Sequence, residues 1–235
     1  AASDVYKRQE EAAAQGLVAG INAHLKINNK EALLLTRDSS YIGVLIDDLV
    51  IKGVDEPYRM FTSRAEYRIL LRQDNADERL TPIGYKIGLI SEDRFKYFQK
   101  KQKNIENFHS FLKNLSVEPN EINKHLISLN SSELSQKTKA YKILLRPEIE
   151  IGFLINNIST INEHVSKNKY SKEEIEAVEI KIKYSNYIER EVEIANKISK
   201  LENIKLLPDF DYFQLTSIST EARQKLSKIK PTTIG

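Results

Sequence analysis

Apolar side chains recur every three or four residues through much of this chain. After Ser91 they stand at Phe95, Phe98, Ile105, Phe108, Phe111 and Leu112. This spacing places them on one face of a helix, and that face must pack against other elements to leave water. Strand-type and helix-type segments do not alternate along the chain. The sequence therefore predicts a mainly α fold built from several helices.

Helix caps and apolar periodicity set the expected boundaries. Ser63-x-x-Glu66 and Ser171-x-x-Glu174 both have the pattern of a capping box. One or two short strands are expected near residues 32–52, although the apolar run 42–46 is too short to separate a strand from a buried helix. The expected helices cover residues 10–26, 64–73, 82–87, 92–115, 121–129, 141–145, 149–155, 172–202 and 220–229.

Composition excludes several classes of protein and site. The chain has 235 residues, of which 40% are hydrophobic and 29% charged, as in a globular protein. Its net charge of +3 means that any RNA site must be a local patch. The absence of cysteine excludes thiolate chemistry and favours a reducing, cytoplasmic compartment. No apolar run approaches the ~20 residues that span a bilayer, and the four histidines lack metal-binding spacing.

The strongest candidate site is a group of arginines. Arg64, Arg68 and Arg72 stand four residues apart, which on a helix would align three guanidinium groups. Arginine binds phosphate with two hydrogen bonds, and neighbouring aromatic side chains could stack on RNA bases. Together with Arg59, these residues form a candidate RNA-binding set, whose aromatic neighbours are Tyr58, Phe61 and Tyr67.

An internal ion-pair network is the alternative explanation of these arginines. The carboxylates available for it are Glu56, Glu66, Asp74, Asp77 and Glu78. Asp47 and Asp48 form a separate acidic pair. On a strand their side chains would point to opposite faces, so we expect a role in a cap or a turn rather than joint action on one substrate atom.

The first expected helix carries two glycines, Gly16 and Gly20, among many alanines. Glycine costs a helix interior about 1 kcal/mol relative to alanine. Their presence indicates a surface that another element or a ligand approaches closely, and packing against a sheet is the favoured explanation.

Three neighbouring segments carry a resemblance to a known family. They are Tyr41–Leu49, Glu56–Arg68 and Asp74–Asp77, and further matching segments lie at Glu11–Ala23, Leu144–Glu148, Lys183–Ile188 and Leu207–Tyr212. The sequence resembles the glucose-inhibited division protein A family, the FAD-dependent large subunit of the tRNA uridine 5-carboxymethylaminomethyl modification enzyme. The similarity extends over residues 10–235 and is weakest from 116 to 140.

The resemblance implies a C-terminal fragment, inactive alone, of a longer enzyme. Residues 1–9 depart from the family pattern and are expected to be foreign or artefactual. Residues 10–75 would be the end of an α/β, Rossmann-like FAD-binding domain together with the arginine-rich segment. Residues 76–235 would be a multi-helix domain that contacts tRNA and the partner protein, with a final short helical region after it. The FAD phosphate-binding glycines and the NADH-binding part would precede this chain.

The resemblance also implies the reaction and its participants. With a GTPase partner, the enzyme would place an aminomethyl or carboxymethylaminomethyl group on C5 of the wobble uridine of tRNA. FAD is the implied cofactor, NADH and methylenetetrahydrofolate are the implied co-substrates, and a homodimer in the cytoplasm, without membrane association, is the implied form of the whole enzyme.

The family's site residues match a few positions of this sequence. Gln15 and Gly16 match the flavin-contacting helix, and Arg59, Arg64, Arg68 and Arg72 match basic residues suited to tRNA. The resemblance assigns no catalytic residue and no metal ligand within this chain. A non-catalytic helical RNA-binding module, or a scaffold for a protein partner, remains the alternative.

Overall fold

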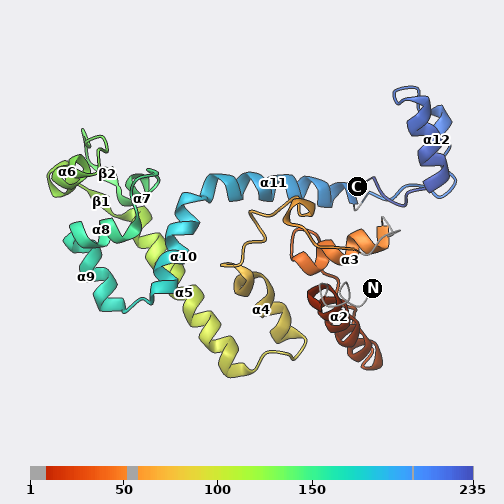
Figure 1. The fold of residues 1–235 in the computed structure, drawn as a ribbon, viewed down its shortest axis with the longest axis horizontal. Coiled ribbons are helices and arrows are strands. Elements are labelled where there is room, and N and C mark those ends of the chain that lie inside the picture. Colours follow the sequence, from red (N-terminus) through yellow and green to blue (C-terminus); the bar gives the residue numbers. More distant parts are fainter. Residues whose placement is uncertain (1–8, 52–57, 203, 235) are drawn as a thin grey trace. The chain divides into compact units, whose positions relative to one another are not determined.

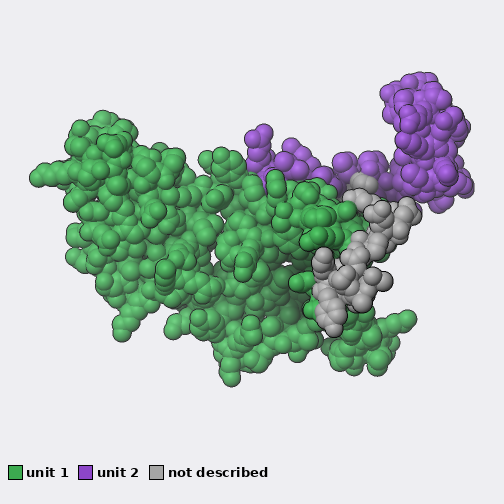
Figure 2. All heavy atoms as spheres, in the orientation of Figure 1, with its two compact units in different colours: residues 1–188 green, residues 189–235 purple. Residues whose placement is uncertain are grey.

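The computed structural model describes residues 9–51, 58–202 and 204–234 (Figure 1). Helices predominate in these residues, so the predicted mainly α fold is confirmed. The chain divides into two compact units, residues 1–188 and 189–235 (Figure 2). None of the described helices combines the length and hydropathy that crossing a bilayer requires. Except for Gln9, the segment expected to be foreign lies outside the described residues.

The first unit begins with helix α2 (Gln9–Ile27), as predicted, and a turn at Asn28 and Asn29. Helix α3 (Tyr41–Ile51) follows, so the expectation of strands near residues 32–52 is wrong. The hydroxyl of Ser40 accepts a hydrogen bond from the Gly43 N–H at 2.9 Å, which stabilises the first turn of α3. A Cβ at Gly43 would lie 2.2 Å from the Thr36 carbonyl oxygen, so only glycine allows this approach.

The helix expected over residues 64–73 is absent from the structure. A single 3-10 turn, η2 (Thr62–Arg64), is followed by irregular turns up to α4 (Ala76–Lys86). Ser63 lies inside η2 and caps nothing, because the Glu66 side chain that would complete its capping box binds Arg37 instead. Helix α4 also begins earlier than the expected start at Pro82, with two acidic residues in its first turn, where negative charge is favourable.

The largest hydrophobic core lies in the second half of the first unit. Helix α5 (Glu92–Asn114) starts at the predicted cap, Ser91, and packs against α10 (Lys172–Lys183). Between them the chain forms α6 (Pro119–Ser128), α7 (Ala140–Leu144), α8 (Ile151–Asn157) and α9 (Ser159–Asn168), of which α9 was not expected. Strands β1 (Ser116–Val117) and β2 (Thr138–Lys139) pair antiparallel. The most buried core side chains include Phe108, Leu112, Ile122, Leu126, Leu144, Leu154 and Ile161.

The helix expected over residues 172–202 is two helices. Helix α10 ends at its C-cap Tyr184, and α11 (Ser185–Glu202) begins at the next residue. The burial of the apolar stripe changes at this point. Val178 and Ile182 of α10 are buried in the core, whereas Val192 and Ile198 of α11 are about 40% exposed. Val192 and Ile198 therefore do not continue the buried stripe of α10.

The second unit contains most of α11, a 3-10 turn η3 (Tyr212–Gln214) and helix α12 (Thr220–Ile229). Ser219 caps α12, as predicted, by accepting a hydrogen bond from the Ala222 N–H at 3.2 Å. The Asp211 side chain accepts from the Phe213 N–H at 3.0 Å, and Arg223 of α12 donates to the Phe213 carbonyl at 3.3 Å. These polar contacts join η3 to α12.

A buried cation joins three helices of the first unit. The ammonium group of Lys101 on α5 lies 2.7 Å from a carboxylate oxygen of Asp77 on α4 and 2.5 Å from one of Glu173 on α10. Burial alone would lower the pKa of Lys101, but the hydrogen bonds to Asp77 and Glu173 outweigh it and raise the pKa above its ordinary value. The lysine is therefore charged at neutral pH and holds α4 against the helical core.

His164 is half-buried and lies in an aromatic stack against this core. Its ring is parallel to that of Phe111, with centroids 3.7 Å apart, and its Nε2 lies 3.1 Å from the Tyr170 hydroxyl. Burial, together with the nearby charge of Lys167, lowers the pKa of His164.

The two predicted capping boxes allow a matched test of stability. The hydroxyl of Ser171 accepts from the Glu174 N–H at 3.2 Å, so Ser171→Ala should reduce the free energy of unfolding by about 1 kcal/mol. Ser63→Ala should leave it nearly unchanged, because Ser63 caps no helix. Thermal and urea unfolding of the two variants measures both values. Equal losses would contradict the assignment of the caps.

The lowered pKa of His164 makes stability depend on pH. As the pH falls through about 6.5, the unfolded chain takes up a proton that the folded stack resists, so acidification should reduce the free energy of unfolding. His164→Phe keeps a ring in the stack and removes the titrating group, and this part of the acid loss should disappear. Unfolding midpoints measured from about pH 7 to pH 5 test this; parallel pH profiles of the two proteins would contradict it.

Candidate nucleic-acid interface

The guanidinium group of Arg37 makes the central contacts in the region of the predicted arginine site. Arg37 Nη1 lies 2.8 Å from a carboxylate oxygen of Asp47 and 2.8 Å from one of Asp48. Its Nη2 and Nε donate to the two oxygens of Glu66, at 2.7 and 3.1 Å. Nη2 also donates to the Arg64 carbonyl at 3.0 Å. Arg37 thus joins the end of α3 to the irregular segment 58–75, which we call the arginine loop.

The helical form of residues 41–51 explains how two adjacent carboxylates reach one cation. Successive side chains on a helix are about 100° apart, so Asp47 and Asp48 can both face Arg37. The expectation that they point to opposite faces, which assumed a strand, is wrong. Burial alone would lower the pKa of Arg37, but hydrogen bonds to Glu66, Asp48 and Asp47 outweigh it and raise that pKa.

Asp48 also binds the start of the arginine loop. Its side chain is only 1% exposed. The Tyr58 hydroxyl donates to Asp48 Oδ2 at 2.8 Å, and Arg64 Nη1 lies 3.6 Å from the same oxygen. The Arg64 guanidinium stacks over the Tyr58 ring, 4.7 Å from its centroid. Burial, with the hydrogen bond to Asp48 second, raises the pKa of Tyr58 to about 12.

The four predicted arginines do not form one row, because residues 64–72 are not a helix. Arg64 is half-buried beside Asp48, and Arg72 pairs with Asp74 at 3.0 Å. Arg59 is exposed and lies over the Phe61 ring, 5.4 Å from its centroid. Arg68 is exposed too, and no hydrogen bond or ion pair engages it within the described part of the chain.

The alternative of an internal ion-pair network holds for part of the loop. Asp74 pairs with Arg72, as that alternative expects. Glu66 and Asp77 instead bind Arg37 and Lys101, two cations that the sequence did not single out. Glu56 lies outside the described residues. Arg37 lies in the connection between α2 and α3, outside the arginine-rich segment, and only its contacts in the folded chain reveal its role.

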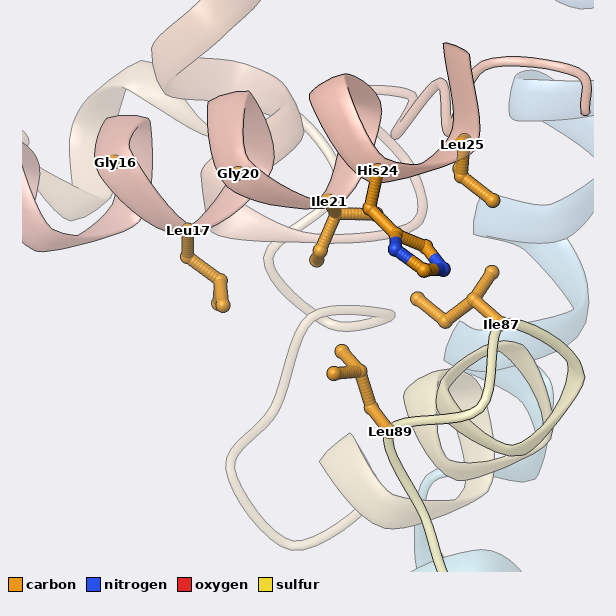
Figure 3. A pocket seen from close by; sticks show the side chains of 8 residues that line it. All are labelled: Gly16, Leu17, Gly20, Ile21, His24, Leu25, Ile87 and Leu89. Atoms are coloured by element: carbon orange, nitrogen blue, oxygen red, sulfur yellow. The ribbon is translucent and has the colours of Figure 1, made fainter. Parts of the chain in front are cut away.

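The glycine-bearing face of α2 is open. Gly16 and Gly20 line a cavity of about 320 Å³ together with apolar side chains of α2 and of the segment after α4 (Figure 3). A Cβ added at either glycine would meet nothing within 4 Å, so packing among the described residues does not require glycine there. Gln15 is exposed nearby. The small residues leave room for a flat group to approach the helix backbone.

Metal ligation is not a feature of this region. Among residues 9–51, 58–202 and 204–234, no cluster of three or more His, Cys, Asp or Glu side chains could hold a metal ion. The arginine, tyrosine and phenylalanine side chains of the arginine loop are suited to binding anions and rings.

Comparison with known proteins identifies relatives along nearly the whole chain. Residues 92–192 match the family model of the tRNA modifying enzyme MnmG/GidA C-terminal helical domain, and residues 194–235 match that of the C-terminal helical bundle of the same enzyme. The tRNA uridine 5-carboxymethylaminomethyl modification enzymes MnmG of Cytophaga hutchinsonii and Bacteroides thetaiotaomicron are 50% and 52% identical to this chain over 96% of its length.

A solved structure of the same family also resembles this chain. Crystal form II of Aquifex aeolicus GidA matches 95% of the chain with a TM-score of 0.68 and 39% identity. The chain covers 34% of that structure's chain, and 36% and 37% of the two curated relatives. It thus spans about a third of the length of the proteins it matches.

The contact between Asp48 and Tyr58 can be tested through the tyrosine pKa. Asp48→Asn removes the negative charge, so the pKa of Tyr58 should fall from about 12 toward 10. The fall should be partial, because burial is the larger cause of the shift. Asp74→Asn, which alters the partner of Arg72, should leave Tyr58 unaffected. NMR titration of labelled tyrosine rings measures both; an unchanged Tyr58 titration in Asp48→Asn would refute the contact.

Proposed function

Because the chain belongs to the MnmG/GidA family of tRNA-modifying enzymes, we propose that it forms the C-terminal part of an FAD-dependent enzyme. The enzyme would install a 5-carboxymethylaminomethyl or aminomethyl group on the wobble uridine of tRNA. The observation that carries this proposal is the 50% identity over 96% of the chain to a protein of that named activity.

The proposed division of labour follows the boundaries expected from the sequence. Residues 10–75 complete the FAD-binding domain and supply the arginine loop, and residues 76–235 contact tRNA and a GTPase partner. The rest of the enzyme, which this chain does not cover, binds most of FAD and the co-substrates NADH and methylenetetrahydrofolate. The active form is a cytoplasmic homodimer. On this proposal, the present chain alone has no activity.

The open face of α2 supports a flavin-contacting role for Gln15 and Gly16. The glycine Cα atoms leave the helix backbone accessible, and the adjoining cavity is mainly apolar, as suits one face of a flat ring. When bound, the flavin would supply the redox chemistry, while these residues would position the ring.

The arginine loop supports a role in tRNA binding. Arg59, Arg64, Arg68 and Arg72 bring four guanidinium groups to one loop of a protein whose net charge is only +3. Tyr58 and Phe61 lie beside two of them. Such a local patch can bind the phosphate backbone and stack on unpaired bases without making the whole molecule basic.

A chimera tests the proposed function directly. Residues 10–235 would replace the aligned segment of the Cytophaga hutchinsonii relative, and the chimera would be expressed in a strain that lacks its own enzyme. We expect modified wobble uridine to return in its tRNA, as measured by mass spectrometry of digested nucleosides. A well-folded, flavin-loaded chimera that leaves wobble uridine unmodified would refute the proposal.

The same experiment needs the isolated chain as its control. This chain alone should neither restore the nucleoside nor purify with flavin absorbance, because the proposal assigns most of the FAD site to the part it does not cover. Near-stoichiometric flavin in the isolated chain would show that residues 10–235 hold the cofactor by themselves.

A further inference from the structure

The arginine loop contains two kinds of arginine. Arg64 and Arg72 are engaged internally, the first by Asp48 and the Tyr58 ring and the second by Asp74. Arg59 and Arg68 are exposed, and within the described residues no carboxylate pairs with either. A guanidinium that already binds a carboxylate must give up that contact to bind a phosphate, whereas a solvated one need not.

Little regular structure holds the loop in place. Apart from the three residues of η2, the backbone from 58 to 75 is in turns and extended segments. Its apolar anchors are Ala65, Tyr67 and Leu71, which are at most 7% exposed. Its polar anchors are the contacts with Arg37 and Asp48. The outward positions 59 and 68 lie on opposite sides of Ala65 in the sequence, so both depend on these anchors.

Arg37 is the polar anchor with the most contacts. It binds the backbone carbonyl of Arg64 and both side-chain oxygens of Glu66, which lie four and two residues before Arg68. Its Nη1 atom binds Asp47 and Asp48, which lie on helix α3. Lysine cannot reproduce this arrangement, because one ammonium group has three donors and no fork geometry.

We propose that Arg37 is a positioning residue for tRNA: it holds the arginine loop so that Arg59 and Arg68 make the phosphate contacts, while Arg64 and Arg72 maintain the shape of the loop. This inference rests on the proposed function and assigns unequal roles to four arginines that the sequence treats alike. Arg37 itself contacts no RNA, because carboxylates and a carbonyl occupy its donors.

The first test separates direct contacts from internal ones in the full-length chimera. Binding to unmodified tRNA is measured by fluorescence anisotropy between about 50 and 200 mM salt. Arg68→Gln and Arg59→Gln should each weaken binding about tenfold. Each should reduce the slope of log affinity against log salt by about 0.7 to 0.9. Arg64→Gln and Arg72→Gln, from the same loop, should lower the slope less than these two variants, because their side chains hold the shape of the loop and make no phosphate contact.

The second test separates positioning from a general loss of structure. Arg37→Lys keeps the charge and should nevertheless weaken tRNA binding about tenfold, while thermal unfolding confirms that the protein remains folded. The triple variant Arg37→Lys/Arg59→Gln/Arg68→Gln should bind little more weakly than Arg59→Gln/Arg68→Gln, because Arg37 acts through those two contacts. A residue with a merely structural role would give additive losses.

Each outcome has a defined meaning. If all four loop variants lower the salt slope equally, the loop binds tRNA but the unequal roles are wrong. If Arg37→Lys binds as tightly as the unaltered chimera, or the loss in the triple variant is additive, the positioning role is wrong. If no loop variant changes affinity or slope, the loop is not a tRNA site, and the proposed function loses that support while the nucleoside assay still tests the enzyme.

Discussion

The contact of Arg37 with three carboxylates joins helix α3 to the arginine loop. Without it, Asp48 would retain a buried negative charge beside Tyr58, and Glu66 would have lost its closest cation. Arg64 also lies near Asp48, but loss of Arg37 would remove a cation 2.8 Å from this buried carboxylate, and breaking a buried ion pair costs several kcal/mol. The arginine loop has little secondary structure because these side-chain contacts hold it instead.

A second cation, Lys101, joins helix α4 to the helical core. It binds Asp77 at the start of α4 and Glu173 at the start of α10. Helix α4 follows directly on the arginine loop, and α10 packs along α5. The loop is therefore attached at one end through Arg37 and at the other through α4. In both attachments the cation is largely shielded from solvent, and salt screens such a pair less than one between two fully exposed side chains.

Short-range signals were sufficient to predict many boundaries from the sequence. Ser91, Ser171 and Ser219 each cap the helix that follows, because the cap and its partner lie within three residues of each other. Ser63 has the same local pattern and fails, because Glu66 finds a stronger partner 29 residues away. The helix 41–51 was ambiguous for a similar reason, since its burial depends on partners remote in sequence.

In the candidate site, too, the sequence could not predict the positions of single side chains that depend on remote partners. Sequence spacing identified the loop that carries the arginines, but it assumed a helix that would align Arg64, Arg68 and Arg72. The structure instead turns Arg64 inward to Asp48 and leaves Arg68 exposed. Spacing alone could not find Arg37, because its partners lie 10, 11 and 29 residues away. The binding specificity of an arginine-rich segment thus depends on two features. One is which guanidinium groups are exposed, and the other is which internal ion pairs set the direction of those groups.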